Sequence, residues 1–339
     1  MPPHESLAAG ERQRLIGSAG AHHVSFLVGS ISPRILMIYV SLPELTTPEL
    51  LRWQTRAERE TLALTVTAAA GGTIKFKENL YKKHVRDLLF AAFQGKCAYC
   101  ESKICDTQPG DIDHFRPKGA LTDENDKEVI LEDGRTHRGY YWLAYSLANL
   151  LPTCRTCNSG TTGTDGRRLG KLTRFPIQGV RVSEPGHSEE SLSGEQPVFL
   201  HPCFDHPEEE LDFDRQTGHL LGLTSRATLF INLMGLNRGG LPVRRKEVYY
   251  NVKAYVIDAW RARLERDLDL ACLREQWLEG VKLGRTEYAM VGRKGLDEMD
   301  EALNEIGSML PQLRKARPAQ APSTRKKQRR RSNQTFGTR

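Results

Sequence analysis

The sequence predicts an α+β fold, with a small zinc-stapled core of short strands and a mainly α-helical C-terminal region. Two C-x-x-C pairs, Cys97/Cys100 and Cys154/Cys157, supply four thiolates for a tetrahedral Zn²⁺ site. Short segments of alternating polar and apolar residues lie between and after the pairs, which is typical of half-buried strands. From Ser225 onward, apolar residues recur at helical spacing.

The bulk composition indicates a globular protein with about two domains in its 339 residues. No run of eighteen apolar residues occurs, and the apolar stretch 24–40 does not look like a signal peptide, so we expect a cytoplasmic protein without a membrane span. Without an export signal, the seven cysteines are more typical of thiols or metal ligands than of disulfides.

The net charge of +7 is concentrated at the C-terminus, where residues 311–339 hold ten basic and no acidic residues. We expect a basic disordered tail at 317–339, which either keeps the chain in solution or binds phosphates. Residues 1–36 lack any sustained period and are expected to be a disordered extension, with the functional protein beginning near Met37.

The segments between these ends divide at changes of composition. We expect an N-terminal helical segment at 37–95, a zinc-bound core at 96–180 and a mainly helical region at 181–316. Expected strands lie at 37–40, 111–115, 197–200, 210–213 and 219–221. Expected helices lie at 46–60, 79–93, 140–148, 225–236, 243–279 and 296–315. Expected loops lie at 122–139 and 181–196, with a flexible insert at 159–170.

The two cysteine pairs are the strongest chemical signal in the chain. They are separated by 53 residues, more than the about 15–20 of a simple zinc ribbon, so an inserted element lies between them. Thiolate ligation contributes roughly 10–16 kcal/mol in small zinc peptides, enough to fix a short motif. Accidental thiols and a redox pair are the alternatives. Cys105, Cys203 and Cys272 are expected to be spare or buried thiols.

Oxygen and imidazole groups between and after the pairs suit a harder metal than zinc. Asp113 and His114 lie in an alternating segment, where they would point to opposite sides unless the strand bends. His114 is a reasonable general base for water. Asp113 and Asn158, which lies in the first turn of a helix that starts near Cys157, offer two oxygen ligands for Mg²⁺. Asn149 is expected to pin the loop that carries His114. A surface Asp-His pair without a catalytic role is the alternative.

The stretch 97–158 resembles the HNH endonucleases. The matching motifs are, in order, C-A-Y-C, D-I-D-H-F-R-P-K and A-N-L-L-P-T-C-R-T-C-N. The resemblance implies a zinc-stapled ββα-metal HNH core in which His114 activates water. It also implies that Asp113 and Asn158 bind one catalytic Mg²⁺ or Mn²⁺ and that Asn149 orients the loop.

A closer similarity is to the HNH proteins of Septu-type and retron-associated anti-phage systems, which typically pair with an ABC/SMC-like ATPase. It covers about residues 37–250 and includes K-C-A-Y-C-E-S, H-F-R-P-K and F-L-H-P-C-F-D-H-P. It implies an effector nuclease with an ATPase partner. The family usually has a lysine soon after the final asparagine. Here the next lysine is Lys171, beyond the insert, so Arg167 or Arg168 could replace it at the phosphate.

The resemblance implies metal-dependent hydrolysis of phosphodiester bonds in nucleic acid. Arg116 and Lys118 follow the strand and are expected to contact neighbouring phosphates. We expect DNA rather than RNA as the partner. The expected contacts are with the phosphate backbone and not with the bases, so the site itself does not distinguish the two. Two alternatives stay open: a zinc-ribbon nucleic-acid-binding module without catalysis, and a toxin-like RNase.

Three other patterns have a structural and a functional interpretation. The segment 201–206, with two histidines, a cysteine and an aspartate, is either a rigid proline-bounded strand end or a second metal cluster. The aromatic residues 140–142 either pack in the core or stack on bases. The apolar residues within 252–260 indicate either core packing or an interface with another copy or an ATPase.

Overall fold

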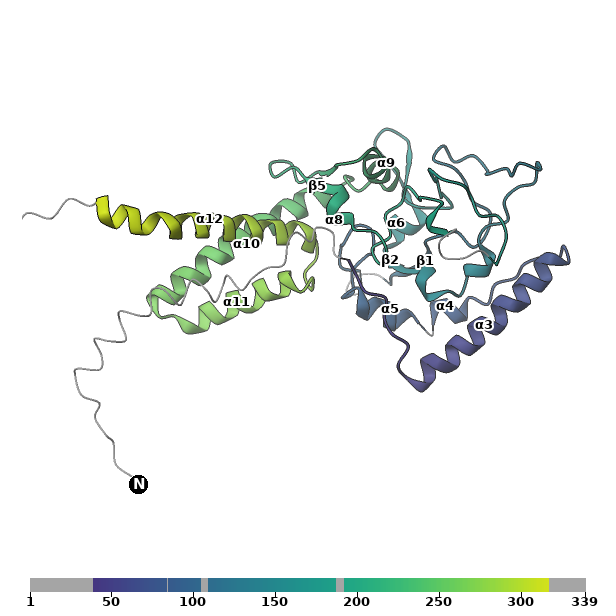
Figure 1. Ribbon diagram of the computed structural model, residues 1–339, viewed down its shortest axis with the longest axis horizontal. Helices are drawn as coiled ribbons and strands as arrows, with labels where there is room; N and C mark the ends of the chain where they lie inside the picture. Colours follow the sequence, from purple (N-terminus) through teal and green to yellow (C-terminus); the bar gives the residue numbers. More distant parts are fainter. Residues whose placement is uncertain (1–38, 84, 105–108, 187–191, 317–339) are drawn as a thin grey trace, which may run out of the picture. The chain divides into compact units, whose positions relative to one another are not determined.

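A computed structural model describes residues 39–83, 85–104, 109–186 and 192–316, with side chains as far as Ile306 (Figure 1). The predictions for the extension at 1–36 and the tail at 317–339, and that for Cys105, lie outside the described residues. None of the described helices combines the length and the apolar content that crossing a membrane requires.

The N-terminal part forms three helices: α3 (Pro48–Ala69), α4 (Asn79–Lys82) and α5 (Arg86–Ala92). The Thr47 hydroxyl caps α3 by accepting a hydrogen bond from the backbone of Leu50. The prediction that this helix ends near Glu60 was wrong: it continues to Ala69, because Leu64 and Ala68 extend its buried face, and the left-handed Gly71 follows its end.

The single helix predicted at 79–93 is instead two short helices, α4 and α5. The break lets both pieces bury apolar residues, with Leu80 and Tyr81 in the core on one side and Leu89 and Phe90 on the other. The Trp53 indole of α3 donates to the carbonyl of Leu80 at 2.7 Å, which ties α4 to α3. The strand predicted at 37–40 is absent from the described residues of that segment, 39 and 40.

Two strands and a short helix follow the N-terminal helices along the chain. They are β1 (Asp111–His114), β2 (Leu150–Thr153) and α6 (Arg155–Ser159). β1 and β2 are antiparallel, with Asp113 opposite Leu151. The predictions of a strand at 111–115 and of a helix start near Cys157 are confirmed.

The helix predicted at 140–148 is two 3₁₀ turns, η1 (Tyr141–Leu143) and η2 (Leu147–Asn149). A continuous α-helix would need the carbonyls of Leu143 and Ala144 for its own amides. Here Asn149 donates to the Leu143 carbonyl and His114 bonds that of Ala144. Aromatic residues 140–142 are buried, which favours the core interpretation over base stacking.

The segments after α6 include two hairpins. The predicted flexible insert is a hairpin of β3 (Thr161–Thr162) and β4 (Arg168–Leu169). The strands predicted at 210–213 and 219–221 are confirmed as β5 (Leu211–Phe213) and β6 (Leu220–Gly222), preceded by α8 (Pro207–Glu210). The prediction of a strand at 197–200 was wrong. The Arg226 guanidinium donates hydrogen bonds to the carbonyls of Pro197 and Phe199, in place of a neighbouring strand.

The C-terminal helices are α9 (Ser225–Met234), α10 (Leu241–Glu265), α11 (Leu268–Lys282) and α12 (Ala289–Ala316). The long helix predicted at 243–279 is wrong: Arg266 is left-handed (φ 64°), Asp267 caps α11, and α10 packs beside α11 (Figure 1). α12 begins earlier than the predicted residue 296. One compact unit ends at Met299 and a second begins at Asp300.

Candidate active site and metal centre

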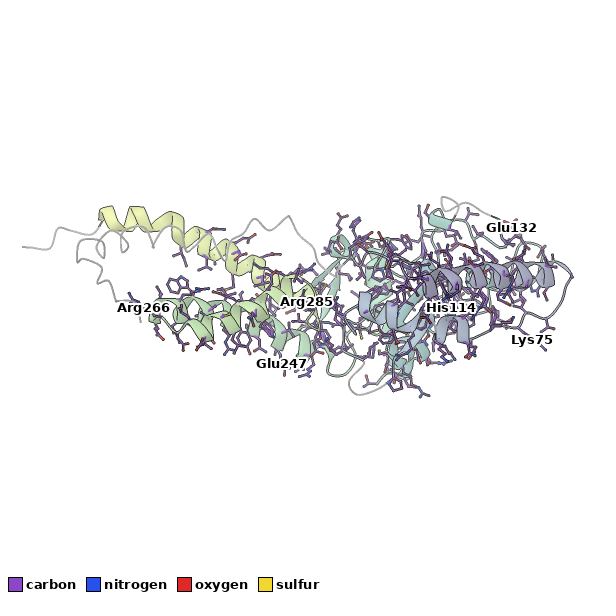
Figure 2. All side chains as sticks on the ribbon, turned by 90° about the horizontal axis from the view of Figure 1, so that it is seen from below. Lys75, His114, Glu132, Glu247, Arg266 and Arg285 are labelled. Atoms are coloured by element: carbon purple, nitrogen blue, oxygen red, sulfur yellow. The ribbon has the colours of Figure 1, made fainter. Side chains whose placement is uncertain are left out.

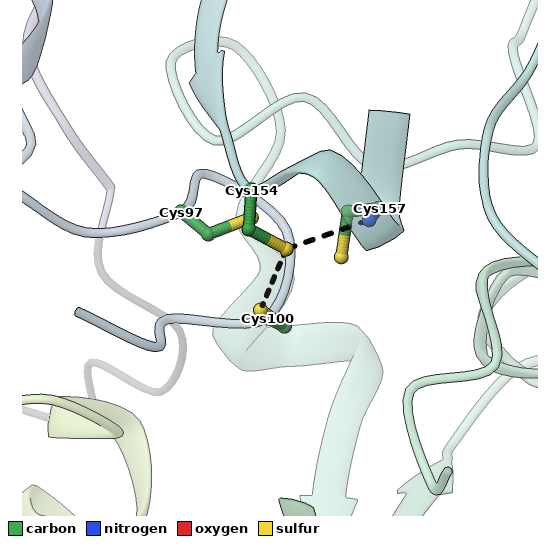
Figure 3. Close-up of side chains that lie close together, drawn as sticks. All are labelled: Cys97, Cys100, Cys154 and Cys157. Atoms are coloured by element: carbon green, nitrogen blue, oxygen red, sulfur yellow. Dashed lines mark hydrogen bonds between the residues drawn. The ribbon is translucent and has the colours of Figure 1, made fainter. Parts of the chain in front are cut away.

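Four cysteines from two separate segments meet beside α6 (Figure 3). Their sulfur atoms all lie within 4.8 Å of one another, all four residues are buried, and Cys100 Sγ lies 3.9 Å from Cys154 Sγ. Tetrahedral Zn²⁺ with bonds of about 2.3 Å separates its sulfur ligands by about 3.8 Å. The donor set therefore fits a structural zinc ion. No other group of this kind occurs in the described ranges.

Arg238 adds a positive charge at the edge of the four-cysteine cluster. Its guanidinium donates to Cys157 Sγ at 3.1 Å. Burial alone would lower the pKa of Arg238, but the negative charge of Cys157 and its neighbours raises it above its ordinary value. The guanidinium thus stays charged and favours thiolates at the cluster. The sequence alone assigned no role to this residue.

A cavity of about 830 Å³ opens beside β1 and α6. Its lining contains the two residues expected to hold a cation, Asp113 and Asn158, and the expected base, His114, which is labelled in Figure 2. Strand alternation would direct Asp113 and His114 apart, but β1 ends at His114 and both residues line this cavity. We call it the Asp113 cavity.

His114 is held in one tautomer by the backbone. Its Nε2 lies 3.0 Å from the carbonyl oxygen of Ala144, which can only accept, so Nε2 carries the proton. Burial, helped by the nearby charge of Lys118, lowers the pKa of His114 to about 3. The ring is therefore neutral at physiological pH, and its Nδ1 is left unprotonated. A nitrogen in that state can accept a proton from water.

Asp113 is held from both sides. Its Oδ2 accepts a hydrogen bond of 2.7 Å from the Tyr99 hydroxyl, whose pKa is raised far above its usual value by burial. Its Oδ1 lies 3.4 Å from Nζ of Lys171, which is only 1% exposed. These contacts fix the carboxylate at the cavity wall.

A second carboxylate, missed by the sequence analysis, supports Asn158. The Asn158 side-chain nitrogen donates to Asp111 Oδ2 at 3.2 Å, which leaves the amide oxygen of Asn158 available as a ligand. Asp111 also lines the Asp113 cavity. The period of two along β1 places Asp111 on the same face as Asp113, and that signal could have found it.

Lys171 reaches the Asp113 cavity although an insert separates it from Asn158 in the sequence. The backbone nitrogen of Lys171 donates to the Cys157 carbonyl at 2.7 Å, and that of Leu172 donates to the Asn158 carbonyl at 2.9 Å. These bonds close the base of the β3–β4 hairpin. Lys171 is thereby returned to α6 whatever the hairpin contains.

The other basic residues proposed for phosphate contact divide between two locations. Lys118 lines the Asp113 cavity, and burial lowers its pKa. Arg167 and Arg168 are exposed on the hairpin and outside the cavity lining, with Arg167 paired to Asp165 at 2.6 Å.

Arg116 faces away from this cavity. It pairs with the buried Glu195 at 2.8 Å, donates to the Leu192 carbonyl, and lines a different cavity of about 850 Å³. The structure therefore does not bring Arg116 to the residues proposed to bind phosphate.

Asn149 lies behind the cavity and bonds the loop that follows His114. Its Oδ1 accepts from the Arg116 backbone nitrogen at 2.8 Å, and its Nδ2 donates to the carbonyls of Arg116 and Leu143. Asn149 therefore ties the loop that follows His114 to the segment at Leu143.

The histidines of segment 201–206 are engaged with protein groups. His201 bonds the Ala148 carbonyl through Nε2 and accepts from the Cys203 backbone through Nδ1. The exposed His206 pairs with Glu208. Both nitrogens of His201 are thus used, which favours a rigid segment over a second metal cluster.

Comparison with known proteins finds relatives that each match less than half of the chain. Over 147 residues, 42% of this chain, it is 42% identical to Septu protein PtuB of Bacillus mycoides (strain KBAB4), of which the match covers 43%. Over 159 residues, 46% of this chain, it is 30% identical to Septu protein PtuA of the same organism, of which the match covers 20%. No protein-family model matches the chain, and no solved structure matches it.

Proposed function

We propose that this protein is a metal-dependent HNH-type endonuclease that hydrolyses phosphodiester bonds and acts as the effector of a Septu-type anti-phage system. One observation carries the proposal: Asp113, His114, Asn158 and Lys171 line one open cavity beside a closed four-cysteine cluster. Similarity to two Septu proteins supports the defence role.

The residues of the cavity divide the chemistry among them. His114, held by Ala144 with Nδ1 unprotonated, accepts a proton from the attacking water. Asp113 and Asn158 supply oxygen donors for one Mg²⁺ or Mn²⁺. The cation, when bound, stabilises negative charge on the phosphoryl and leaving oxygens. Lys118 and Lys171 place two positive charges at the same wall, where they attract the phosphate backbone.

An ATPase partner is part of the proposal, because the HNH proteins that this chain resembles typically pair with one. Co-purification of the chain with the products of its neighbouring genes tests it. Recovery of an ATPase supports the defence role, and a chain that co-purifies with none of these products contradicts that part while leaving the nuclease proposal open to its own test.

The nuclease proposal is tested by incubating the full chain with plasmid DNA and, separately, with single-stranded RNA in Mg²⁺, Mn²⁺ or EDTA. Metal-dependent cleavage that is lost in His114→Ala is expected, with His219→Ala as the matched variant because His219 is exposed and outside the cavity lining.

The two alternatives predict different outcomes. A zinc-ribbon binding module would bind nucleic acid and cleave neither substrate under any condition. A toxin-like RNase would cleave RNA and spare DNA. Full activity of His114→Ala with added metal would overturn the assignment of the base.

A further inference from the structure

One face of α10 exposes seven residues that follow one another in steps of four and three: Val243, Glu247, Tyr250, Ala254, Ile257, Arg261 and Leu264. At about 100° of rotation per residue, these steps keep all seven within a sector of about 100°. The four large apolar members are 46–65% exposed. We call these seven residues the α10 stripe.

The opposite face of α10 is already covered. Val252, Val256 and Ala259 are buried there, α11 packs along the helix, and a Cβ at Gly295 of α12 would lie 3.3 Å from Val252. The α10 stripe is therefore not the face that this fold uses for its own core. A repeat of seven with Val243, Tyr250, Ile257 and Leu264 at one position is the pattern of a helix-pairing seam.

The order of the residues in the α10 stripe is self-complementary. Ala254 is the centre, and the large apolar residues Tyr250 and Ile257 flank it. Glu247 lies seven residues before Ala254 and Arg261 lies seven residues after it. A second α10 that runs antiparallel and crosses at Ala254 would place each Glu247 opposite an Arg261, and the small alanine would let the two helices approach closely.

We infer that the α10 stripe is a self-association surface, where two copies of this chain pair through antiparallel α10 helices. A parallel pair would oppose Glu247 to Glu247 and Arg261 to Arg261, which is unfavourable. Among the residues that the structure describes, Glu247 has only the exposed Arg244 as ion partner, at 3.2 Å. Among the side chains that the structure describes, no carboxylate lies within 4.0 Å of Arg261.

Sedimentation equilibrium of the full chain over a range of concentrations tests the inference. The wild-type chain is expected to dimerise. Glu247→Arg and Arg261→Glu each make both cross-helix pairs repulsive, so each is expected to raise the dissociation constant by about tenfold or more. The double variant restores opposite charges and is expected to return to within about threefold of wild type. Val180→Asp is the matched control, because Val180 is 83% exposed and outside α10.

A mixture of the two single variants gives a second readout. One chain then carries arginine at both positions and the other glutamate at both, so mixed dimers are expected to be tighter than either variant alone. A wild-type chain that stays monomeric up to about 100 µM overturns the inference. So does a dimer whose constant the single variants leave unchanged, or a double variant no tighter than the singles.

Discussion

The four-cysteine cluster and the Asp113 cavity both use residues of the five-residue helix α6, but the first is closed and buried and the second is open. Cys154 and Cys157 hold the start of α6 in a closed and buried group of sulfur atoms. Asn158, the next residue along, faces an open cavity with carboxylates, three lysines and a neutral histidine. A closed set of four ligands is typical of structural metal sites, and an open one of catalytic sites. Adjacent residues of one helical turn are thus expected to serve stability on one side and chemistry on the other.

A substitution in the four-cysteine cluster alone is expected to have the largest effect. Cys157→Ser is expected to remove the zinc ion and unfold the core, because metal-coupled folding contributes roughly 10–16 kcal/mol in small zinc peptides. Metal analysis and thermal unfolding by circular dichroism measure the effect. Cys272→Ser is the control, because Cys272 is exposed and outside the cluster. A Cys157→Ser chain with unchanged zinc content and melting temperature would refute the structural role.

Changing the neighbouring residue should have the complementary effect. Asn158→Ala removes one proposed oxygen ligand and is expected to lower the cleavage rate by about 10²-fold or more, since metal positioning contributes several kcal/mol to such reactions. Zinc content and melting temperature are expected to stay close to those of the unaltered protein. Loss of zinc from Asn158→Ala would show that the two sites cannot be separated in this way.

Lys171, at the foot of the β3–β4 hairpin, offers a finer test of the cavity. Lys171→Met keeps the length of the side chain but removes its charge beside Asp113. We expect cleavage to fall by about tenfold and the slope of nucleic-acid affinity against salt to shrink by about one. Arg167→Met, on the exposed part of the hairpin, is the matched variant and should change neither quantity by as much. Equal effects of both variants would place phosphate binding on the hairpin instead.

The smallest expected effect is an acid dependence of stability from His201. Burial lowers the pKa of His201 to about 3, whereas an unfolded histidine has a pKa of about 6.5. Between these values the unfolded state binds a proton that the folded state does not, so stability falls as the pH drops below about 6.5, by up to about 1.4 kcal/mol per pH unit. Denaturant titration from pH 7 to pH 4.5 measures the slope.

His201→Gln keeps a side-chain donor and removes the titrating group. It is therefore expected to lower the slope of stability against pH by the contribution of one proton, up to about 1.4 kcal/mol per pH unit. His219→Ala, at an exposed position, should leave it unchanged. An unaltered slope in His201→Gln would mean that His201 does not titrate between the folded and unfolded states as described.

The spacing of residues within short motifs predicted part of the candidate site. The C-x-x-C spacing predicted that the four cysteines meet, and the structure brings their sulfur atoms together. The catalytic roles of Asp113 and His114 stay predictions. Contacts between distant segments that carry no shared metal-binding motif were not predictable. Arg116 turns from the cavity because Glu195, buried and 79 residues away, pairs with its guanidinium.

The helix breaks were missed for a different reason. The turn between α10 and α11 uses a left-handed arginine, Arg266, where glycine or asparagine is the usual signal. The break between α4 and α5 falls within a stretch with no glycine or proline, and follows from how its apolar residues pack. In both places tertiary packing outweighs the local pattern.

Because hydrogen bonds close the foot of the β3–β4 hairpin, the length of the hairpin does not affect where Lys171 lies in the Asp113 cavity. Lys171 and Leu172 dock on the carbonyls of Cys157 and Asn158, so the strand-turn-strand above them is a module that could be shortened, exchanged or fitted with a peptide epitope. The number of residues between Asn158 and Lys171 is therefore a poor guide to the equivalent lysine in related chains. The equivalent lysine is better identified as the residue that follows the closing strand of the hairpin.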